Sequence, residues 1–384
     1  MSNTWQSRAW VEVDLDAVRE NFATIRRAVG PEPGIIAMVK ADGYGLGAER
    51  VVRALEPLGP WGYGVATAAE GAALRRAGVR RPILVVSPLS REAMRTAAEA
   101  ELTVAISDLD MLEEWAALAR ARGEPLEFHA EVDTGMGRAG FDWREAAAWG
   151  EALRSRSGEL VRWTGVYTHF QGADAADRGA TALQWERFSD ALVQLPVSRE
   201  DLMIHAANSA AALRWPEYAA DAVRPGIFLY GGHPAPGLGA EMPAPRPVAA
   251  VKARVVLVRN VPPGSTVGYG ATHVARGWER WGTLAIGYGD GLPRCLGNRG
   301  SALVRGRRVA ILGRVSMDMT VVDLTDVPEA EVGDVATLIG RDGEEEIALD
   351  EVAAQAGTIG YEILTGLTAR LPRVETANGD EHGS

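Results

Sequence analysis

Residues 34–49 read GIIAMVKADGYGLGAE, and this stretch decides the architecture that we expect for the chain. An apolar run, GIIAMV, ends at Lys40 and is followed by a glycine-rich turn. A run that is apolar on both faces is typical of a strand in a parallel sheet whose two faces are covered. The stretch therefore predicts a buried parallel strand with a lysine at its carboxyl end.

Seven further apolar runs follow before residue 232, separated by stretches that carry apolar residues at helical spacing. The runs are GYGVAT (62–67), PILVVS (82–87), LTVAIS (102–107), LEFHAEV (126–132), RWTGVYTHF (162–170), LMIHAAN (202–208) and AVRPGIFLY (222–230). Eight strand-then-helix units are the pattern of a closed (β/α)8 barrel. An open doubly wound sheet is the competing architecture, but eight units within so short a segment favour closure.

The composition and spacing of the apolar runs change after residue 230. The segment GGHPAPGLGAEMPAPRP (231–247) is rich in proline and glycine, and the runs beyond it are β-branched and separated by turn residues. We therefore expect the α/β class, with a (β/α)8 TIM-type barrel at residues 1–240 followed by a smaller mainly-β C-terminal domain at residues 241–374. Residues 375–384 are expected to form a frayed tail. The alternating run at residues 10–18 is a candidate strand for pairing with the second domain.

The bulk composition excludes several classes of protein. The chain has 384 residues, 47% of them apolar and 24% charged, which are ordinary globular values. Its formal charge of −11 argues against a nucleic-acid partner or an anionic membrane surface. The single cysteine, Cys295, rules out an intrachain disulfide and suits a reducing compartment. With no leader-like segment and no apolar run of about 18 residues, we expect a soluble cytoplasmic protein.

Lysine is rare in this chain, which makes the position of Lys40 informative. Lys40 and Lys252 are the two lysines, so the other 38 of the 40 basic residues are arginine. Arginine can replace lysine as a surface cation, but a guanidinium stays charged, whereas an ammonium group can lose its proton and act as a nucleophile. The alternative is that Lys40 is a solvated strand end.

Polar residues gather where the predicted barrel strands end, which is where such barrels carry their chemistry. They are Lys40, Arg138, His169, His205, Asn208, Ser209, Arg224 and Gly226. Each has a structural alternative: a histidine can be a packing residue, an arginine an ion-pair partner, and Ser209 the cap of the following helix. Together, however, a lysine, two arginines and two histidines predict a cationic pocket for an anionic cofactor. The sequence contains no P-loop, no G-x-S-x-G and no Cys/His metal spacing.

An ordered set of motifs resembles the alanine racemase family over nearly the whole chain. The motifs are AMVKADGYGLGA, DTGMGRAG, THF-x-x-AD, HAANS, R-x-GI-x-LYG, VGYGATH, GYGDGLPR, GRVSMDM and GTIGYEI. The resemblance implies a barrel plus β-domain enzyme that depends on pyridoxal 5'-phosphate (PLP) and serves D-alanine biosynthesis. It also implies a head-to-tail homodimer whose active sites contain residues from both subunits.

The resemblance also implies roles for individual residues. Lys40 would bind PLP covalently and act as acid/base on one face of the substrate, and Tyr269 of the partner subunit would act on the opposite face. Arg138 would reach the cofactor oxygen and the substrate carboxylate, which Met317 of the partner subunit would also help to hold. Asp318 would line the entrance. The remaining residues would hold the cofactor: Tyr44, Ser209, Gly226, Ile227 and Tyr361 at the phosphate, and Arg224 at the pyridine nitrogen, supported by His169 and His205.

The chain departs from the family pattern at several positions. Where many members carry a modified lysine that orients the arginine, this chain has Glu131, and we predict that Glu131 pairs directly with Arg138. The lysine loop reads ADGYGLG rather than the usual A-(N/D)-AYGHG. These loop changes leave a broad-specificity or serine racemase open as an alternative, and a PLP-dependent decarboxylase is a more distant one because such enzymes share the barrel-plus-β architecture. A decarboxylase of this architecture would carry a catalytic cysteine in the β domain, where the corresponding segment here is GRVSMDM.

Overall fold

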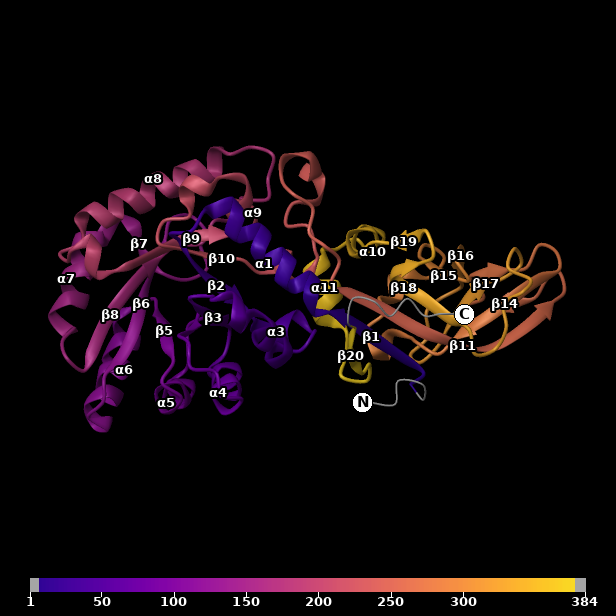
Figure 1. Cartoon of the computed structure of the whole chain (residues 1–384), viewed down its shortest axis with the longest axis horizontal. Helices are drawn as coiled ribbons and strands as arrows, with labels where there is room; N and C mark the ends of the chain where they lie inside the picture. The colour runs from indigo at the N-terminus through magenta and orange to yellow at the C-terminus, as the bar shows by residue number, and fades with distance from the viewer. Residues whose placement is uncertain (1–6, 377–384) are drawn as a thin grey trace.

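The computed structural model describes residues 7–376, apart from the side chains of residues 240 and 241. Figure 1 shows two bodies side by side, with a helix-covered barrel on the left and a β-rich domain on the right. Buried apolar residues of both bodies form one continuous cluster, so the junction between them is packed. No helix among the described residues is long and apolar enough to cross a membrane.

The first body is a closed barrel of eight parallel strands. Its strands pair in the order β5-β4-β3-β2-β10-β9-β8-β6, and a β5–β6 pairing closes the ring. They are β2 (Gly34–Met38), β3 (Gly62–Val65), β4 (Ile83–Val85), β5 (Thr103–Ile106), β6 (Leu126–Asp133), β8 (Val161–Tyr167), β9 (Met203–Asn208) and β10 (Ala222–Arg224), with the short β7 (Phe141–Asp142) added beside β6. The closed barrel expected from the apolar runs is confirmed.

Helices cover the outside of the barrel because each presents a buried face to the strands. They are α1 (Leu15–Val29), α3 (Ala48–Leu55), α4 (Ala68–Arg76), α5 (Arg91–Glu99), α6 (Leu109–Arg122), α7 (Ala146–Arg156), α8 (Gly179–Gln194) and α9 (Ser209–Arg214). Most begin at a side-chain cap, such as Asp108, which accepts a hydrogen bond from the Met111 amide at 2.8 Å.

The last strand of the barrel ends well before its apolar run does. The run at residues 222–230 is a strand only as far as Arg224, and the 3-10 helix η6 (Ile227–Tyr230) follows. Pro225 has no amide hydrogen to continue the ladder, and Gly226 turns the chain with φ −123° and ψ −96°. The strand therefore ends early and brings the Gly226 backbone to the end of the barrel.

The second body is built around a nine-stranded mixed sheet. Its strand order is β19-β18-β15-β16-β17-β14-β11-β1-β20. The strands are β1 (Ala9–Asp14), β11 (Ala249–Val261), β14 (Glu279–Leu284), β15 (Ser301–Val304), β16 (Arg307–Leu312), β17 (Thr320–Asp323), β18 (Val335–Asp342), β19 (Glu345–Ile347) and β20 (Arg373–Thr376). A separate hairpin joins β12 (Thr266–Val267) to β13 (His273–Val274). Two helices, α10 (Leu349–Ala356) and α11 (Gly360–Gly366), complete the domain.

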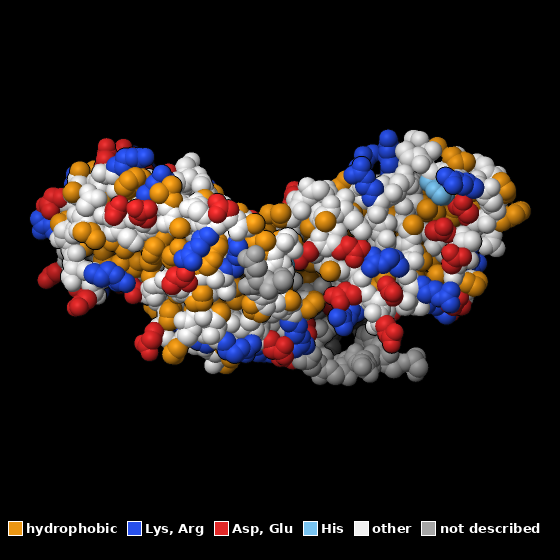
Figure 2. All heavy atoms as spheres, turned by 90° about the horizontal axis from the view of Figure 1, so that it is seen from above, with side chains coloured by type: hydrophobic (Ala, Val, Ile, Leu, Met, Phe, Trp, Pro, Cys, Tyr) orange, Lys and Arg blue, Asp and Glu red, His pale blue; other side chains and the backbone are white. Residues whose placement is uncertain are grey.

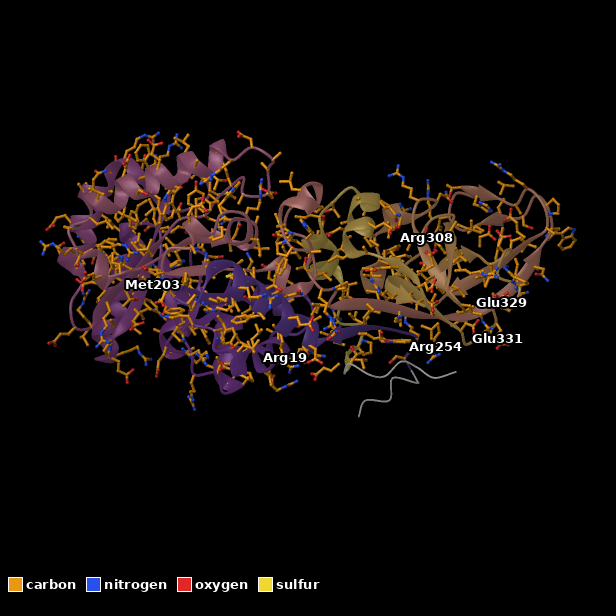
Figure 3. All side chains as sticks on the ribbon, turned by 45° about the horizontal axis from the view of Figure 1, so that its top comes forward. Arg19, Met203, Arg254, Arg308, Glu329 and Glu331 are labelled. Carbon is orange, nitrogen blue, oxygen red and sulfur yellow. The ribbon has the colours of Figure 1, made fainter. Side chains whose placement is uncertain are left out.

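Both ends of the described chain lie in this second sheet. Strand β1 pairs antiparallel with β11 and parallel with β20, before α1 leads into the barrel. Of the tail expected at residues 375–384, Glu375 and Thr376 belong to β20, and the rest lies outside the described residues. Arg308 on β16 holds α10 through Glu351 at 2.5 Å, and Figure 3 marks Arg308 on the β-rich domain.

On the face seen in Figure 2, acidic and basic side chains are interspersed over both bodies, and no single basic patch stands out. That distribution agrees with the 40 basic and 51 acidic residues of the chain.

Candidate active site

Lys40 lies two residues beyond the end of β2, at the carboxyl ends of the barrel strands, which we call the barrel mouth. Its side chain is half-buried. Burial lowers the pKa of the Lys40 amine, the positive charges of Arg138 and Arg224 lower it further, and the charge of Glu70 opposes them. The amine therefore loses its proton more readily than an ordinary lysine, as a nucleophile or proton acceptor must.

The chain after Lys40 makes a left-handed turn, assigned as α2 (Lys40–Tyr44). Ala41 and Asp42 have φ of 52° and 53°, and Tyr44 also has a positive φ. Each such residue costs about 1–2 kcal/mol, so the surroundings must enforce the conformation. The Gly43 amide bonds to the Val39 carbonyl, and the Asp42 carboxylate accepts from the Ala48 amide, both at 2.8 Å.

Arg224 lies buried beneath the barrel mouth, at the end of β10. Its guanidinium donates to the carbonyls of Thr168 at 2.8 Å and Ala206 at 3.1 Å. It also lies 2.7 Å from Nδ1 of His205 and 3.3 Å from Nδ1 of His169. Burial lowers the pKa of Arg224 to about 10, so the guanidinium remains a fixed cation at neutral pH.

The histidines around Arg224 are neutral. Burial and then the charge of Arg224 lower the pKa of His129 and of His169 to about 3, and that of His205 well below the ordinary value. Because Arg224 can only donate, Nδ1 of His205 must accept, and its Nε2 carries the hydrogen. That Nε2 lies 2.8 Å from Nδ1 of His129, which must accept in turn. A hydrogen-bonded row from Arg224 through His205 to His129 thus fixes the guanidinium.

A small polar cradle lies next to this row. The Ser209 hydroxyl accepts a hydrogen bond from the Gly226 amide at 2.8 Å. Asn208 rather than Ser209 caps α9, through the Ala211 amide at 3.1 Å, so the capping alternative for Ser209 does not hold. The Tyr44 ring stacks on Tyr230 with centroids 4.4 Å apart.

The cradle depends on a glycine at position 226. A Cβ added to Gly226 would lie 2.1 Å from the Tyr44 hydroxyl oxygen, which real structures do not tolerate. Ile227, the next residue, is buried, and the Tyr361 ring centroid lies 6.0 Å from that of Tyr44. The structure therefore brings together five of the residues expected at a phosphate: Tyr44, Ser209, Gly226, Ile227 and Tyr361.

The predicted pairing of Glu131 with Arg138 is wrong in its geometry. Within the described residues, no hydrogen bond or ion pair joins the two, and Glu131 instead accepts from the Ser107 hydroxyl at 3.1 Å. Burial raises the pKa of Glu131, while hydrogen bonds from Ser107 and Tyr167 and the charge of Arg138 lower it. Glu131 turns toward neighbouring strands inside the barrel, whereas Arg138 is exposed in the loop beyond β6. Arg138 acts on Glu131 through its charge rather than through a hydrogen bond.

Three of the β-domain residues that the sequence assigned to the site are exposed: Tyr269, Met317 and Asp318. Tyr269 is 70% exposed and Met317 is 53% exposed. In the part of the chain that the structure describes, no hydrogen bond, ion pair or ring contact joins either of them to the barrel mouth. Asp318 accepts a hydrogen bond from Arg370 at 2.7 Å. Among the described residues, the contacts within one chain therefore do not join Tyr269 or Met317 to Lys40.

A buried carboxylate that the sequence did not single out supports the loop carrying Met317. Asp290 is fully buried, accepts two bonds from Arg8 at 2.5 and 2.7 Å, and lies 3.2 Å from Arg370. It also accepts from the Gly287 amide at 2.9 Å. The Met317 carbonyl accepts from the Gly289 amide in the same turn, so the charge cluster fixes the loop. The GYGDGLPR motif contains Asp290, but only the fold brings Arg8 to it.

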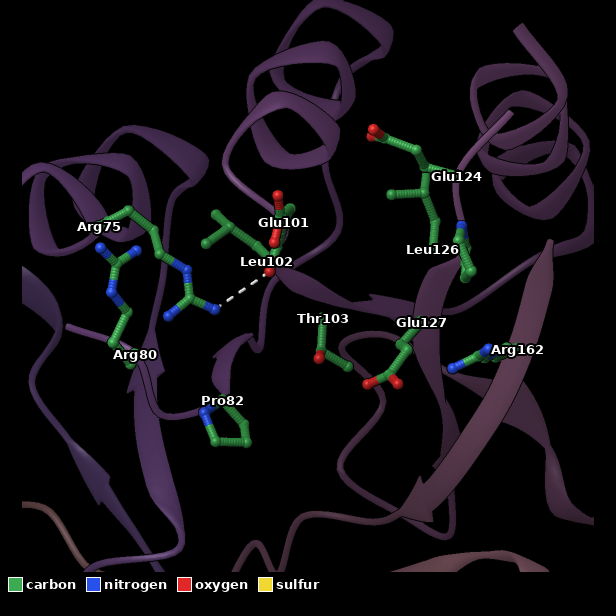
Figure 4. Close-up of a pocket in the computed structure, with 11 residues that line it drawn as sticks. Arg75, Arg80, Pro82, Glu101, Leu102, Thr103, Glu124, Leu126, Glu127 and Arg162 are labelled. Carbon is green, nitrogen blue, oxygen red and sulfur yellow. Dashed lines mark hydrogen bonds between the residues drawn. The ribbon is translucent and has the colours of Figure 1, made fainter. Parts of the chain in front are cut away.

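A cavity of about 440 Å³ lies at the opposite end of the barrel, where strands β4, β5 and β6 begin. Figure 4 shows Arg75 pointing to the Glu101 carbonyl, and its guanidinium also donates to the carbonyls of Val79, Arg81 and Ala100. Arg75 therefore has a structural role, because its hydrogen bonds connect the segments that precede β4 and β5. This end of such barrels serves stability, whereas the chemistry belongs to the other end.

The sequence of this chain is similar to the sequences of known proteins over both of its domains. Residues 13–234 match the family description "Alanine racemase, N-terminal domain", and residues 248–375 match "Alanine racemase, C-terminal domain". The chain is 38% identical to "Alanine racemase 2" of Bacillus subtilis (strain 168), covering 97% of this chain and 95% of that protein. It is 37% identical to an alanine racemase of Synechocystis sp., covering 96% of this chain and 99% of that protein.

Solved structures give the same result. The alanine racemase of Streptomyces coelicolor A3(2) superposes with a TM-score of 0.90 and 36% identity, over 97% of this chain and 99% of that one. The enzyme of Streptomyces lavendulae superposes with a TM-score of 0.90 and 35% identity, over 98% and 99%. Fold, domain order and sequence agree over nearly the full length, and the chain therefore belongs to the alanine racemase family.

Proposed function

We propose that this protein interconverts L-alanine and D-alanine with pyridoxal 5'-phosphate as its cofactor, acting as a cytoplasmic homodimer. The observation that carries the proposal is the half-buried Lys40 amine, whose pKa is lowered by burial and by the charges of Arg138 and Arg224. A lysine in this state is suited both to holding an aldehyde cofactor and to moving a proton.

The residues at the barrel mouth fit the cofactor. The Ser209 hydroxyl, the Gly226 backbone and the Tyr44 hydroxyl form a cradle that a Cβ would fill, and this cradle supports placing the phosphate there. Arg224 would face the ring nitrogen, and its row of hydrogen bonds to neutral histidines keeps the guanidinium protonated and in place. When bound, PLP supplies an electron sink for the negative charge that develops at the substrate Cα.

Racemisation needs a proton carrier on each face of Cα, since one proton leaves and another arrives on the opposite side. Lys40 would serve one face because its pKa is lowered by burial and by neighbouring positive charges, which helps the amine to accept and return a proton. Tyr269 would serve the other face. Arg138 is exposed beyond β6 and would bind the substrate carboxylate, an anion that a guanidinium binds with two hydrogen bonds.

A second copy of the chain would complete the site. Tyr269 and Met317 lie on the open surface of the β domain, so they would reach the barrel mouth of a neighbouring chain rather than their own. Each site would then contain Lys40 of one subunit together with Tyr269 of the partner subunit. A symmetric dimer would carry two such sites.

The reaction is tested by incubating the purified protein and PLP with L-alanine and measuring D-alanine by chiral chromatography, with L-serine and L-lysine in parallel. The proposal expects alanine to give the largest kcat/KM. Equal or faster turnover of serine would identify a serine or broad-specificity racemase instead. Absence of any racemisation by protein with bound cofactor would refute the proposal.

The shared site is tested by mixing two inactive variants, Lys40→Ala and Tyr269→Phe. If the site is shared, heterodimers regain up to about one wild-type site each. A lack of recovery, with subunit exchange confirmed by native mass spectrometry, would place both residues in the site of one chain.

A further inference from the structure

Glu70 caps the N-terminus of α4 and also makes a hydrogen bond outside that helix, which capping does not require. It is the third residue of α4, where it forms a capping box with Thr67: the Glu70 amide bonds to the Thr67 hydroxyl at 3.2 Å, and the carboxylate accepts from the Thr67 amide at 3.2 Å. The same carboxylate oxygen accepts from the Ala66 amide at 2.9 Å. Its other oxygen leaves the helix altogether and accepts from the Ala41 amide at 2.7 Å.

This last hydrogen bond is made to the residue directly after Lys40. Ala41 begins the left-handed turn, with φ 52° and ψ 47°, a conformation that an alanine does not choose by itself. Ala41 is exposed, so packing cannot hold it there. A bond to an ionised carboxylate is among the stronger hydrogen bonds available, and it links the end of β2 to the neighbouring β3–α4 connection.

Glu70 also supplies the negative charge that acts on the Lys40 amine. Arg138 and Arg224 act on that amine as cations, and His169, which lies beside Arg224, is neutral. Burial and the two arginines lower the pKa of Lys40, and Glu70 raises it. The carboxylate therefore offsets part of the cationic field of the mouth at the nitrogen that must exchange protons.

We propose that Glu70 is a positioning residue for Lys40: its carboxylate holds the left-handed turn that presents the lysine and balances the cationic groups around the amine. The part of the proposal that concerns catalysis rests on the function proposed above. The effects of Glu70 on the turn and on the pKa of Lys40 do not depend on that function, and both can be measured without following the reaction.

Three substitutions separate the two roles from simple helix capping. Glu70→Gln keeps the size of the side chain and removes the charge. Glu70→Asp keeps the charge and shortens the reach by one methylene. Thr67→Ala is the matched control, because it weakens the same capping box while leaving the carboxylate untouched.

The turn is measured by hydrogen–deuterium exchange of the peptide spanning residues 40–47 in the full-length, cofactor-free protein. Loss of a hydrogen bond to a charged acceptor should accelerate exchange there at least about tenfold in Glu70→Gln and Glu70→Asp. Thr67→Ala should accelerate exchange in α4 and leave residues 40–47 as in the wild type.

The charge is measured on Lys40 itself, which the composition makes possible because the chain has only two lysines. Reductive methylation with ¹³C-formaldehyde gives one signal for each lysine, and Lys252→Arg assigns them. Lys40 should titrate at lower pH in Glu70→Gln than in the wild type, and closer to the wild type in Glu70→Asp. Lys252, which lies on β11 in the other domain, is the internal reference.

The proposal is overturned if residues 40–47 exchange in the Glu70 variants as they do in Thr67→Ala, or if Lys40 titrates identically in Glu70→Gln and the wild type. Should Glu70→Gln fail to fold, the exchange of Glu70→Asp decides, since it retains the charge. Neither readout involves alanine. A protein that fails to racemise alanine but shows both effects would refute the proposed function and leave the role of Glu70 intact.

Discussion

Replacing Gly226 by alanine should displace Tyr44 and weaken both stability and cofactor binding. The new Cβ would lie 2.1 Å from the Tyr44 hydroxyl oxygen, so the ring tip would have to move about 1.3 Å to restore ordinary contact at 3.4 Å. Tyr44 has no room to do so, because it is buried and stacked on Tyr230. Overpacking of this kind costs about 1–3 kcal/mol, and loss of the stacking about 1 kcal/mol more.

We therefore expect Gly226→Ala to lower the free energy of unfolding by about 2–4 kcal/mol in urea titrations. Titration of the cofactor-free protein with PLP, followed by absorbance, should show at least tenfold weaker binding. Gly158→Ala is the matched control, because a Cβ at Gly158 meets nothing within 4 Å. Wild-type PLP affinity with a stability change under about 0.5 kcal/mol would refute the reasoning.

Other substitutions and conditions test the remaining parts of the account. Tyr269→Phe should abolish racemisation while PLP binding stays within about twofold, because only the proton carrier of one face is lost; retained alanine racemisation would contradict the two-base assignment. Asp290→Asn should lower stability by about 2 kcal/mol in urea titrations, a value discounted because Arg8 and Arg370 are partly exposed; a loss below about 0.5 kcal/mol would show that the cluster is not needed. Because the pKa of the half-buried His169 is about 3 in the folded chain and near 6.5 when unfolded, the unfolded state binds more protons between these values, and stability should fall as pH drops from 6.5 toward 3. His169→Asn should show a smaller decline, and an identical pH profile would contradict the assignment.

The barrel and the identity of its mouth residues followed from the sequence because both depend on simple periodic rules. Apolar runs at the right spacing predicted eight parallel strands, and the carboxyl ends of parallel strands must meet at one end of a barrel. Lys40, His205 and Arg224 therefore come together as expected. The row of hydrogen bonds that ends at His129 was not predicted, because that histidine lies within a strand rather than at its end.

Contacts that depend on side-chain direction were not accessible from the sequence. Glu131 has the right parity to point into the barrel, but only the fold shows that Ser107 reaches it and Arg138 does not. The left-handed turn at Ala41 contradicts local preference, and tertiary hydrogen bonds such as that from Ala41 to Glu70 impose it.

The most direct test of the central claim is to reduce the protein with borohydride in the presence of PLP and locate the label by peptide mass spectrometry. Reduction fixes the cofactor to the amine that holds it, and the two lysines of the chain leave two candidate positions. The account predicts one pyridoxyl group per chain, on the peptide that contains Lys40. A label on the peptide that contains Lys252, or no label on protein saturated with PLP, would contradict it.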